Sequence, residues 1–198
     1  MSSYDRLLWS TIMLCLILAS CGDQDSKPVS SEDLSSYKVY SGDGFSFRYP
    51  NNWEVGTSQL RTTRVLIRAK PEETGYAASC NVNASEVEGI EGITQKRLDS
   101  LNHKIHDRGY FKETVGSAMP GAQINNIDKY STISLQPATE IEFNAKVRSP
   151  QIDTKNKFRQ VVTIKKPYRY VLMCRALPSN YSRARPAFNL IMNTFYFE

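Results

Sequence analysis

The sequence contains few residues of the types that usually perform catalysis, with two histidines and four cysteines among 198 residues. It also lacks a glycine-rich phosphate loop, a Gly-x-Ser-x-Gly elbow and a Cys-x-x-Cys pair, which mark nucleotide-binding, hydrolase and redox sites. Glycine and proline number only 10 and 9, which excludes a collagen-like or low-complexity chain. The sequence therefore points to no common class of enzyme.

Long apolar runs are also missing. The longest, from Leu7 to Ala19, is shorter than the roughly 20 residues that a helix needs to cross a bilayer. A hydrophobic content of 40% and a charged content of 23% are typical of one soluble globular domain. The apolar run therefore reads as the core of a signal peptide.

The residues after this run specify how the signal peptide ends. Leu18, Ala19, Ser20 and Cys21 resemble a bacterial lipobox, in which a peptidase cuts before a cysteine whose thiol has received a lipid. Acyl chains on Cys21 would hold the protein on a membrane. An ordinary secretory peptide and an uncleaved anchor are the alternatives.

Three segments follow from this assignment. Residues 1–20 form the signal peptide, residues 21–36 a lipidated flexible tether that is rich in serine and aspartate, and residues 37–198 the folded domain. Gly22 after the lipidated cysteine favours the outer membrane over the inner one, although Asp23 leaves this open. We expect the domain on the periplasmic face of a bacterial membrane.

Processing leaves two cysteines that can pair. Cys15 departs with the signal peptide and Cys21 becomes a thioether, so Cys80 and Cys174 remain. An even pair in an exported domain favours a disulfide. Two buried free thiols are the alternative.

Alternation of apolar and polar residues predicts mainly β-structure. Phe45, Phe47 and Tyr49 alternate with polar residues and place three aromatic side chains on one face of a strand. The same reasoning predicts strands over 65–67, 77–82, 139–148, 158–165 and 168–176, and either a short terminal strand or an extended tail over 194–197.

Two segments show helical periodicity. The first covers Thr94 to Arg108, with Thr94 as its N-terminal cap and Gly109 at its end. The second contains Phe188 and is expected to start near Ser182 as a possible cap. Runs of strands with helices between and after them predict an α+β fold, an antiparallel β-sheet flanked by helices.

Several segments carry a family resemblance. GFSFRYPNNW at 44–53, ASCNV at 78–82, YVLMC at 170–174 and FNLIMNTFYF at 188–197 resemble the PsbP-like α/β/α sandwich, and the lipobox favours its DcrB-type bacterial lipoproteins. The resemblance implies helices on both sides of the sheet, a role in binding or assembly, and neither enzyme activity nor a cofactor. Tyr49, Pro50 and Trp53 match the motif, and we interpret them as core and turn.

Two pairs of residues could carry chemistry. His103 and His106 lie three positions apart on the predicted helix, which suits two metal ligands, but we expect them on a solvated surface and predict no metal site. Glu140 and Glu142 alternate along one strand, and we interpret them as its solvent-facing side and not as an acid–base pair.

The charge distribution is more informative. The net charge of +5 conceals a strongly basic stretch between Lys146 and Arg185, in which Asp153 is the one acid. Such fields attract anionic partners. The basic patch that we predict from this stretch consists of Lys146, Arg148, Lys155, Lys157, Arg159, Lys165, Lys166 and Arg169.

The basic residues have a second interpretation, since lysines also protect an exposed sheet edge against pairing. Export argues against nucleic acid as the partner and favours an acidic protein or an anionic envelope lipid. The sequence thus predicts a non-catalytic, membrane-anchored periplasmic lipoprotein that binds such a partner. A small-ligand carrier with a cleft between sheet and helices is the alternative, and a hydrolase with an unrecognised site is a third.

Overall fold

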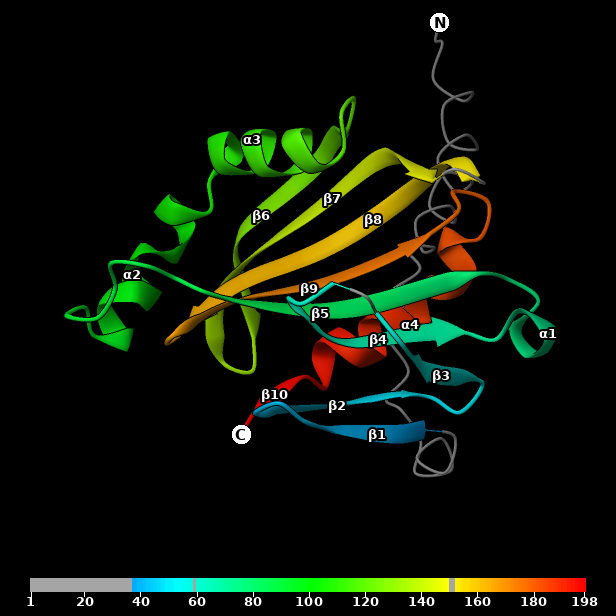
Figure 1. Cartoon of the computed structure of the whole chain (residues 1–198), viewed down its shortest axis with the longest axis horizontal. Coiled ribbons are helices and arrows are strands. Elements are labelled where there is room, and N and C mark those ends of the chain that lie inside the picture. The colour runs from blue at the N-terminus through cyan, green and yellow to red at the C-terminus, as the bar shows by residue number, and fades with distance from the viewer. Residues whose placement is uncertain (1–36, 59, 150–151) are drawn as a thin grey trace, which may run out of the picture. The chain divides into compact units, whose positions relative to one another are not determined.

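A computed structural model describes residues 37–58, 60–149 and 152–198 (Figure 1). The predicted signal peptide and tether, including Cys21, lie outside these residues. The strands are β1 Tyr37–Gly42, β2 Phe45–Pro50, β3 Trp53–Gly56, β4 Thr63–Ala69, β5 Ala78–Glu86, β6 Gln123–Ile133, β7 Gln136–Ser149, β8 Ile152–Lys165, β9 Tyr168–Ala176 and β10 Tyr196–Phe197. The helices are α1 Pro71–Thr74, α2 Gln95–Ile105, α3 Arg108–Ala118 and α4 Tyr181–Asn193.

The strands form two antiparallel sheets. The larger has seven strands in the order β3-β4-β5-β9-β8-β7-β6, and the smaller has three in the order β1-β2-β10. Every pair in both sheets is antiparallel. The predicted fold class, an antiparallel sheet flanked by helices, is confirmed.

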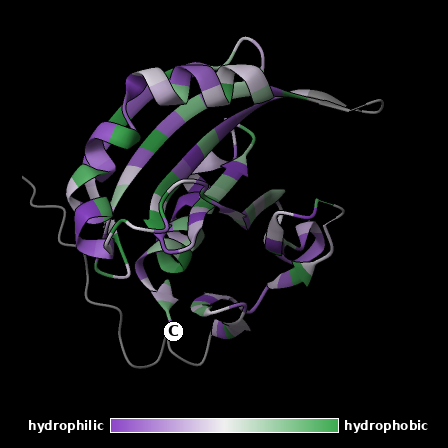
Figure 2. Ribbon diagram, turned by 60° about the vertical axis from the view of Figure 1, so that its left-hand side comes forward, coloured by the Kyte–Doolittle hydropathy of each residue, from purple (hydrophilic) through white to green (hydrophobic). Residues whose placement is uncertain are grey.

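Alternation along the strands gives the large sheet two apolar faces, and Figure 2 shows it as bands of hydrophobic and hydrophilic residues. On one face, α4 packs with the small sheet over β5 and β9, where Phe188, Ile191 and Leu172 belong to one buried cluster. On the other face, α2 and α3 lie over β6, β7 and β8, and Phe111 is buried with Phe143. Both faces therefore contribute to the core.

The helices do not extend over the whole second face. Figure 1 shows β4, β5 and β9 with α4 behind them and no described helix in front. The side chains on this uncovered side include Leu66, Asn81 and Met173, which are register neighbours and only partly buried. The uncovered strands meet the covered ones beside the C-terminal end of α3.

The first predicted helix divides in two. It starts at the Thr94 cap, as expected, but ends at Ile105. The Asp107 side chain then accepts a hydrogen bond from the Tyr110 N–H at 2.9 Å and caps α3. The prediction of a helix end at Gly109 was wrong, because this glycine lies in the first turn of α3 and the aspartate before it offers a strong new cap.

The second predicted helix forms as α4, with Asn180 and not Ser182 at its N-terminal cap. Pro186 lies inside the helix, past its first turn, where its missing N–H removes one helical hydrogen bond. Phe188, Ile191 and Met192 are buried against the sheet. The prediction of a short terminal strand is confirmed by β10.

The aromatic motif lies in the core between the small sheet and α4. Phe45, Phe47 and Tyr49 are buried on one face of β2. Trp53 is fully buried, and its ring meets the Phe188 ring edge-on with centroids 6.2 Å apart. This agrees with the interpretation of the motif as core and turn.

A disulfide joins Cys80 and Cys174. The two residues face each other directly in the register of β5 and β9, and both are fully buried. The bond therefore links the two central strands on the α4 side of the sheet.

Candidate functional site

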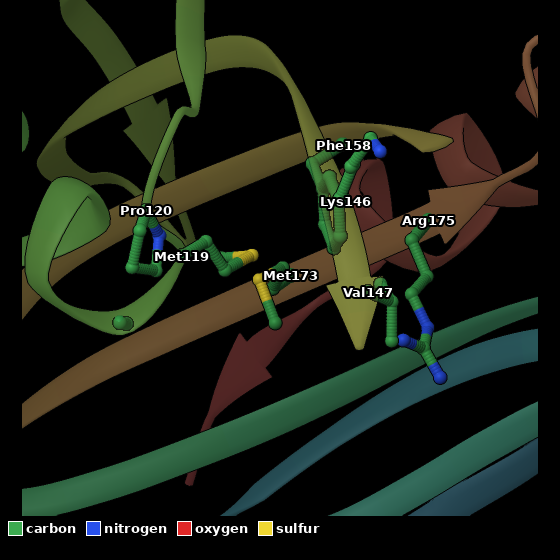
Figure 3. Close-up of a pocket in the computed structure, with 8 residues that line it drawn as sticks. Met119, Pro120, Lys146, Val147, Phe158, Met173 and Arg175 are labelled. Atoms are coloured by element: carbon green, nitrogen blue, oxygen red, sulfur yellow. The ribbon is translucent and has the colours of Figure 1, made fainter. Parts of the chain in front are cut away.

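A groove of ≈ 250 Å³ opens where the C-terminal end of α3 meets β7, β8 and β9 (Figure 3). Its floor comes from the sheet, and one wall comes from the turn that follows α3. The lining residues are Ala118, Met119, Pro120, Lys146, Val147, Phe158, Met173 and Arg175. The groove thus joins segments that are far apart in the sequence.

Flexible and aromatic side chains make up the apolar part of the groove. Met119 and Met173 point toward one another across it (Figure 3). Phe158, which also lines the groove, is buried and stacks on Phe143, with ring centroids 4.7 Å apart. Methionine side chains adapt to differently shaped ligands, so the groove has a rigid floor and adaptable walls.

The charge of the lining has one sign. Lys146 and Arg175 line the groove, and none of its described lining residues is an acid, a histidine or a cysteine. The Arg175 Nε–H donates to Ser79 Oγ at 3.3 Å, and among the described residues no carboxylate pairs with this guanidinium. Desolvation lowers the pKa of Arg175, and an anion bound beside it would compensate for that loss of hydration.

The predicted basic patch does not gather on one surface. Lys157 and Arg159 lie on the α4 side of the sheet, and the register places Lys146 on the same side, at the edge of the groove. The Lys166 ammonium donates to the backbone carbonyls of Glu91 and Ile93 before α2.

The rest of the patch is equally dispersed. The Arg169 guanidinium lies over the Tyr110 ring at 5.4 Å. Lys155 is exposed and Lys165 is half-buried, while the Arg148 side chain lies outside the described part of the chain. Alternation sends neighbouring bases to opposite faces, which explains why a stretch that is continuous in sequence divides in space.

Glu140 and Glu142 are not on a solvated surface, and this expectation was wrong. Glu140 accepts two hydrogen bonds from the Arg159 guanidinium, at 2.7 and 3.0 Å. Glu142 binds the Lys157 ammonium at 3.0 Å and accepts a hydrogen bond from the Tyr181 hydroxyl at 3.0 Å. Arg159 also donates to Asn189 of α4, so these pairs connect α4 to the sheet.

The electrostatics of this network agree with a structural role. Burial alone would raise the pKa of Glu142, but the hydrogen bonds from Lys157 and Tyr181 outweigh it, and the pKa is lowered. Burial beside Glu142 raises the pKa of Tyr181. Both acids are already paired with cations, which leaves neither as a free proton acceptor.

The histidines also differ from the expectation of a solvated pair. His106 is fully buried, and its Nδ1–H donates to Asn102 Oδ1 at 2.9 Å. Burial, assisted by the nearby charge of Arg169, lowers the pKa of His106 to about 4. His103 is only partly buried and packs against the Tyr130 ring, so the two rings do not share one environment.

Other site chemistry is sparse in the part of the chain that the structure describes. No three His, Cys, Asp or Glu side chains come together there in a way that could hold a metal ion. No helix among the described residues has both the length and the apolar character needed to cross a bilayer.

The groove was missed by the sequence reasoning, because Met119 and Met173 come from segments with no common pattern. Arg175 belonged to the basic stretch but was not selected for the patch. Arg175 lies in β9 two residues beyond Met173, on the same face of the strand. This spacing is the one sequence signal that could have suggested that Met173 and Arg175 act together.

Comparison with solved structures shows the fold in distant proteins. Cyanobacterial PsbP (CyanoP) from Synechocystis is 18% identical, with a TM-score of 0.55, and the match covers 82% of this chain and 93% of that one. The Saccharomyces cerevisiae Ran-binding protein Mog1p is 10% identical, with a TM-score of 0.51 and coverages of 81% and 95%.

A third structure comes from Mycobacterium tuberculosis. LpqN, a protein involved in cell envelope biogenesis, is 14% identical, with a TM-score of 0.50 and coverages of 81% and 90%. No curated protein matches the chain. The family model described as PsbP-like protein matches residues 16–197, nearly the whole chain, and the chain therefore belongs to the PsbP-like protein family.

Proposed function

We propose that this protein is a non-catalytic lipoprotein, anchored through Cys21 to the periplasmic face of a bacterial membrane, that binds an anionic component of the cell envelope. The groove beside α3 carries the proposal, because its lining combines apolar side chains with the Arg175 guanidinium and contains no described acid. An acidic protein is the alternative partner. The lipobox residues support the anchor, and the roles of LpqN in envelope biogenesis and of Mog1p in Ran binding fit a binding protein.

The groove chemistry supports binding over catalysis. Its charged side chain on the groove face is the Arg175 guanidinium, which attracts anions but does not form an acid–base pair. The carboxylates that sequence reasoning considered are engaged by Arg159 and Lys157 on the other face. A bound anion would compensate for the partial desolvation of Arg175.

Anchoring is tested by Cys21→Ser in cells that express the full chain. We expect the variant to take up no palmitate and to retain residues 1–20, because the peptidase cuts only after the Cys21 thiol has received its lipid. Palmitate labelling and intact mass measure the two effects. Cys15→Ser is the matched control, since this cysteine lies inside the predicted signal peptide. If Cys21→Ser takes up palmitate and is cut before residue 21 as the parent is, the anchor is refuted.

Binding is tested with the chain from residue 21 onward carrying Cys21→Ser, and with vesicles of phosphatidylglycerol or phosphatidylcholine. We expect co-sedimentation with the anionic vesicles that weakens as salt rises. Arg175→Glu should reduce it, whereas Arg185→Glu, an equal charge change at an exposed position of α4, should not. Equal binding of the two variants would contradict a role for the groove.

A further inference from the structure

A second groove lies along α3, near the start of β6. Its volume is ≈ 320 Å³. Its lining residues are Arg108, Phe111, Lys112, Val115, Gly116, Ala122 and Ile124. Again two cations accompany apolar side chains, and none of the described lining residues is an acid.

The two grooves are openings into one apolar layer. Phe111 and Val115 are the two buried residues of α3, and they belong to the same cluster as Phe158 and Met173 from the first groove. The turn after α3 contributes to both grooves, through Met119 to the first and Ala122 to the second. Helix α3 therefore covers this layer incompletely and leaves apolar surface accessible.

The first groove is poorly suited to a peptide backbone. Its floor strands β8 and β9 are paired on both sides at Phe158 and Met173, whereas β7 extends past the start of β6, which pairs from Gln123 opposite Asn144. The floor of the groove therefore offers no strand edge for an added β-strand. Peptide amides placed against Met119, Phe158 and Met173 would lose water without gaining partners, which is unfavourable.

A hydrocarbon chain has no such groups to satisfy. It gains from contact with the thioethers and the Phe158 floor in proportion to the apolar area that leaves water. An anionic head on the same molecule would meet Arg175, whose Nε–H has only Ser79 as a described side-chain partner. The apolar part of the lining thus suits the hydrocarbon chain of an amphiphile, and the Arg175 guanidinium suits its anionic head.

We infer that the groove formed by Met119, Phe158, Met173 and Arg175 binds a single-chain anionic amphiphile, with its acyl chain between the two methionines and its anionic head at Arg175. This inference rests on the proposed function and names the chemical class of its ligand. The chain contacts the apolar layer beneath α3, and the head remains at the groove mouth.

The methionines provide a direct reporter. After the predicted signal peptide is removed, the chain retains Met119, Met173 and Met192. Met192 is buried in the separate cluster on the α4 side. With ¹³C-methyl methionine, NMR titration of the Cys21→Ser chain from residue 21 onward with lysophosphatidylglycerol, below its micelle concentration, should shift the Met119 and Met173 signals and leave Met192 unchanged.

Matched variants and probes make the assignment specific. Arg175→Glu should weaken lysophosphatidylglycerol binding about tenfold or more, the change expected when an ion pair becomes a like-charge contact, while Arg185→Glu should bind like the parent. The unchanged Met192 signal verifies that each variant is folded. Inorganic phosphate and dodecyl maltoside, which supply only the charge or only the chain, should each bind more weakly than the amphiphile.

The outcomes separate this inference from the proposed function. Saturable shifts at Met119 and Met173 that depend on Arg175 support the amphiphile. Binding to phosphatidylglycerol vesicles without any methionine shift from the amphiphile would overturn the inference and leave the proposed function standing. Equal binding of phosphate alone, or of an acidic peptide in place of the amphiphile, would also overturn it. If neither vesicles nor amphiphile bind, both proposals fail.

Discussion

The buried ring of His106 makes the stability of this protein sensitive to acid in a predictable way. Its Nδ1–H donates to Asn102 Oδ1, and the Asn102 amide donates in turn to Thr139 Oγ1 at 3.3 Å. The Nε2 atom is buried without a hydrogen-bond partner among the described residues. The Tyr110 ring packs edge-on at 5.0 Å between centroids, and the Arg169 cation lies over Tyr110.

The sign of the effect follows from the pKa. Burial first, and the Arg169 charge second, lower the pKa of His106 from 6.5 to about 4 in the folded state. Well above pH 6.5 the ring is neutral in both states and contributes no pH dependence. As the pH falls from 6.5 toward 4, the unfolded chain binds a proton that the folded chain does not, so stability is lost over this window. The shift corresponds to a loss of about 3 kcal/mol by pH 4.

Urea unfolding at several pH values between about 7 and 4 measures this loss, and His106→Gln removes the titrating ring. The variant loses packing at every pH. Across the window, however, its free energy of unfolding should fall by about 3 kcal/mol less than that of the parent. Carboxylates titrate in both proteins, and their contribution cancels in the comparison. His103→Gln is the matched control, because the His103 ring is only partly buried. Parallel pH profiles for the parent and His106→Gln would refute the reasoning.

Three further predictions concern contacts that support the fold. The double variant Cys80→Ala, Cys174→Ala should lose about 4 to 5 kcal/mol in urea unfolding, because the bond closes a long loop across a sequence separation of 94; unchanged stability would contradict this. Glu140→Gln leaves the Arg159 side chain, which is only 15% exposed, without its carboxylate, so stability should fall by about 1 to 3 kcal/mol and recover partly on adding Arg159→Met. No recovery would argue against an uncompensated charge as the cause. Asp107→Ala removes the α3 cap and should cost about 1 kcal/mol, whereas Asp107→Asn should retain most of it; equal losses would exclude capping.

The contacts of Glu140 and Glu142 show why the sequence wrongly predicted a solvent-facing pair of carboxylates. Even-numbered residues of β7 and odd-numbered residues of β8 share the α4 side of the sheet, where Glu142 stands opposite Arg159 in the register. Alternation identified each face correctly but could not show that α4 covers this one. Placing a helix over a polar face requires the tertiary structure.

Helix α3 and strand β6 are the largest elements that sequence reasoning missed. The α3 sequence buries only Phe111 and Val115, which gives a weak helical pattern. Strand β6 is an edge strand whose pairing with β7 shifts register twice, and its residues therefore do not alternate cleanly. Helix α3 lines both grooves and β6 lines the second. Because neither element was predicted, the grooves beside them were not predicted either.

The sequence by itself determined the fold class, the cysteine pair and the aromatic core of β2, because each depends on local alternation or on a short motif. Apolar side chains at period two specify a strand face whatever lies beyond it. The separation of the basic residues, the burial of His106 and the meeting of Met119 with Met173 and Arg175 were decided only by the tertiary structure. These features depend on which elements pack together, and that arrangement arises from many weak apolar contacts between distant segments, none of which is visible in a single stretch of chain.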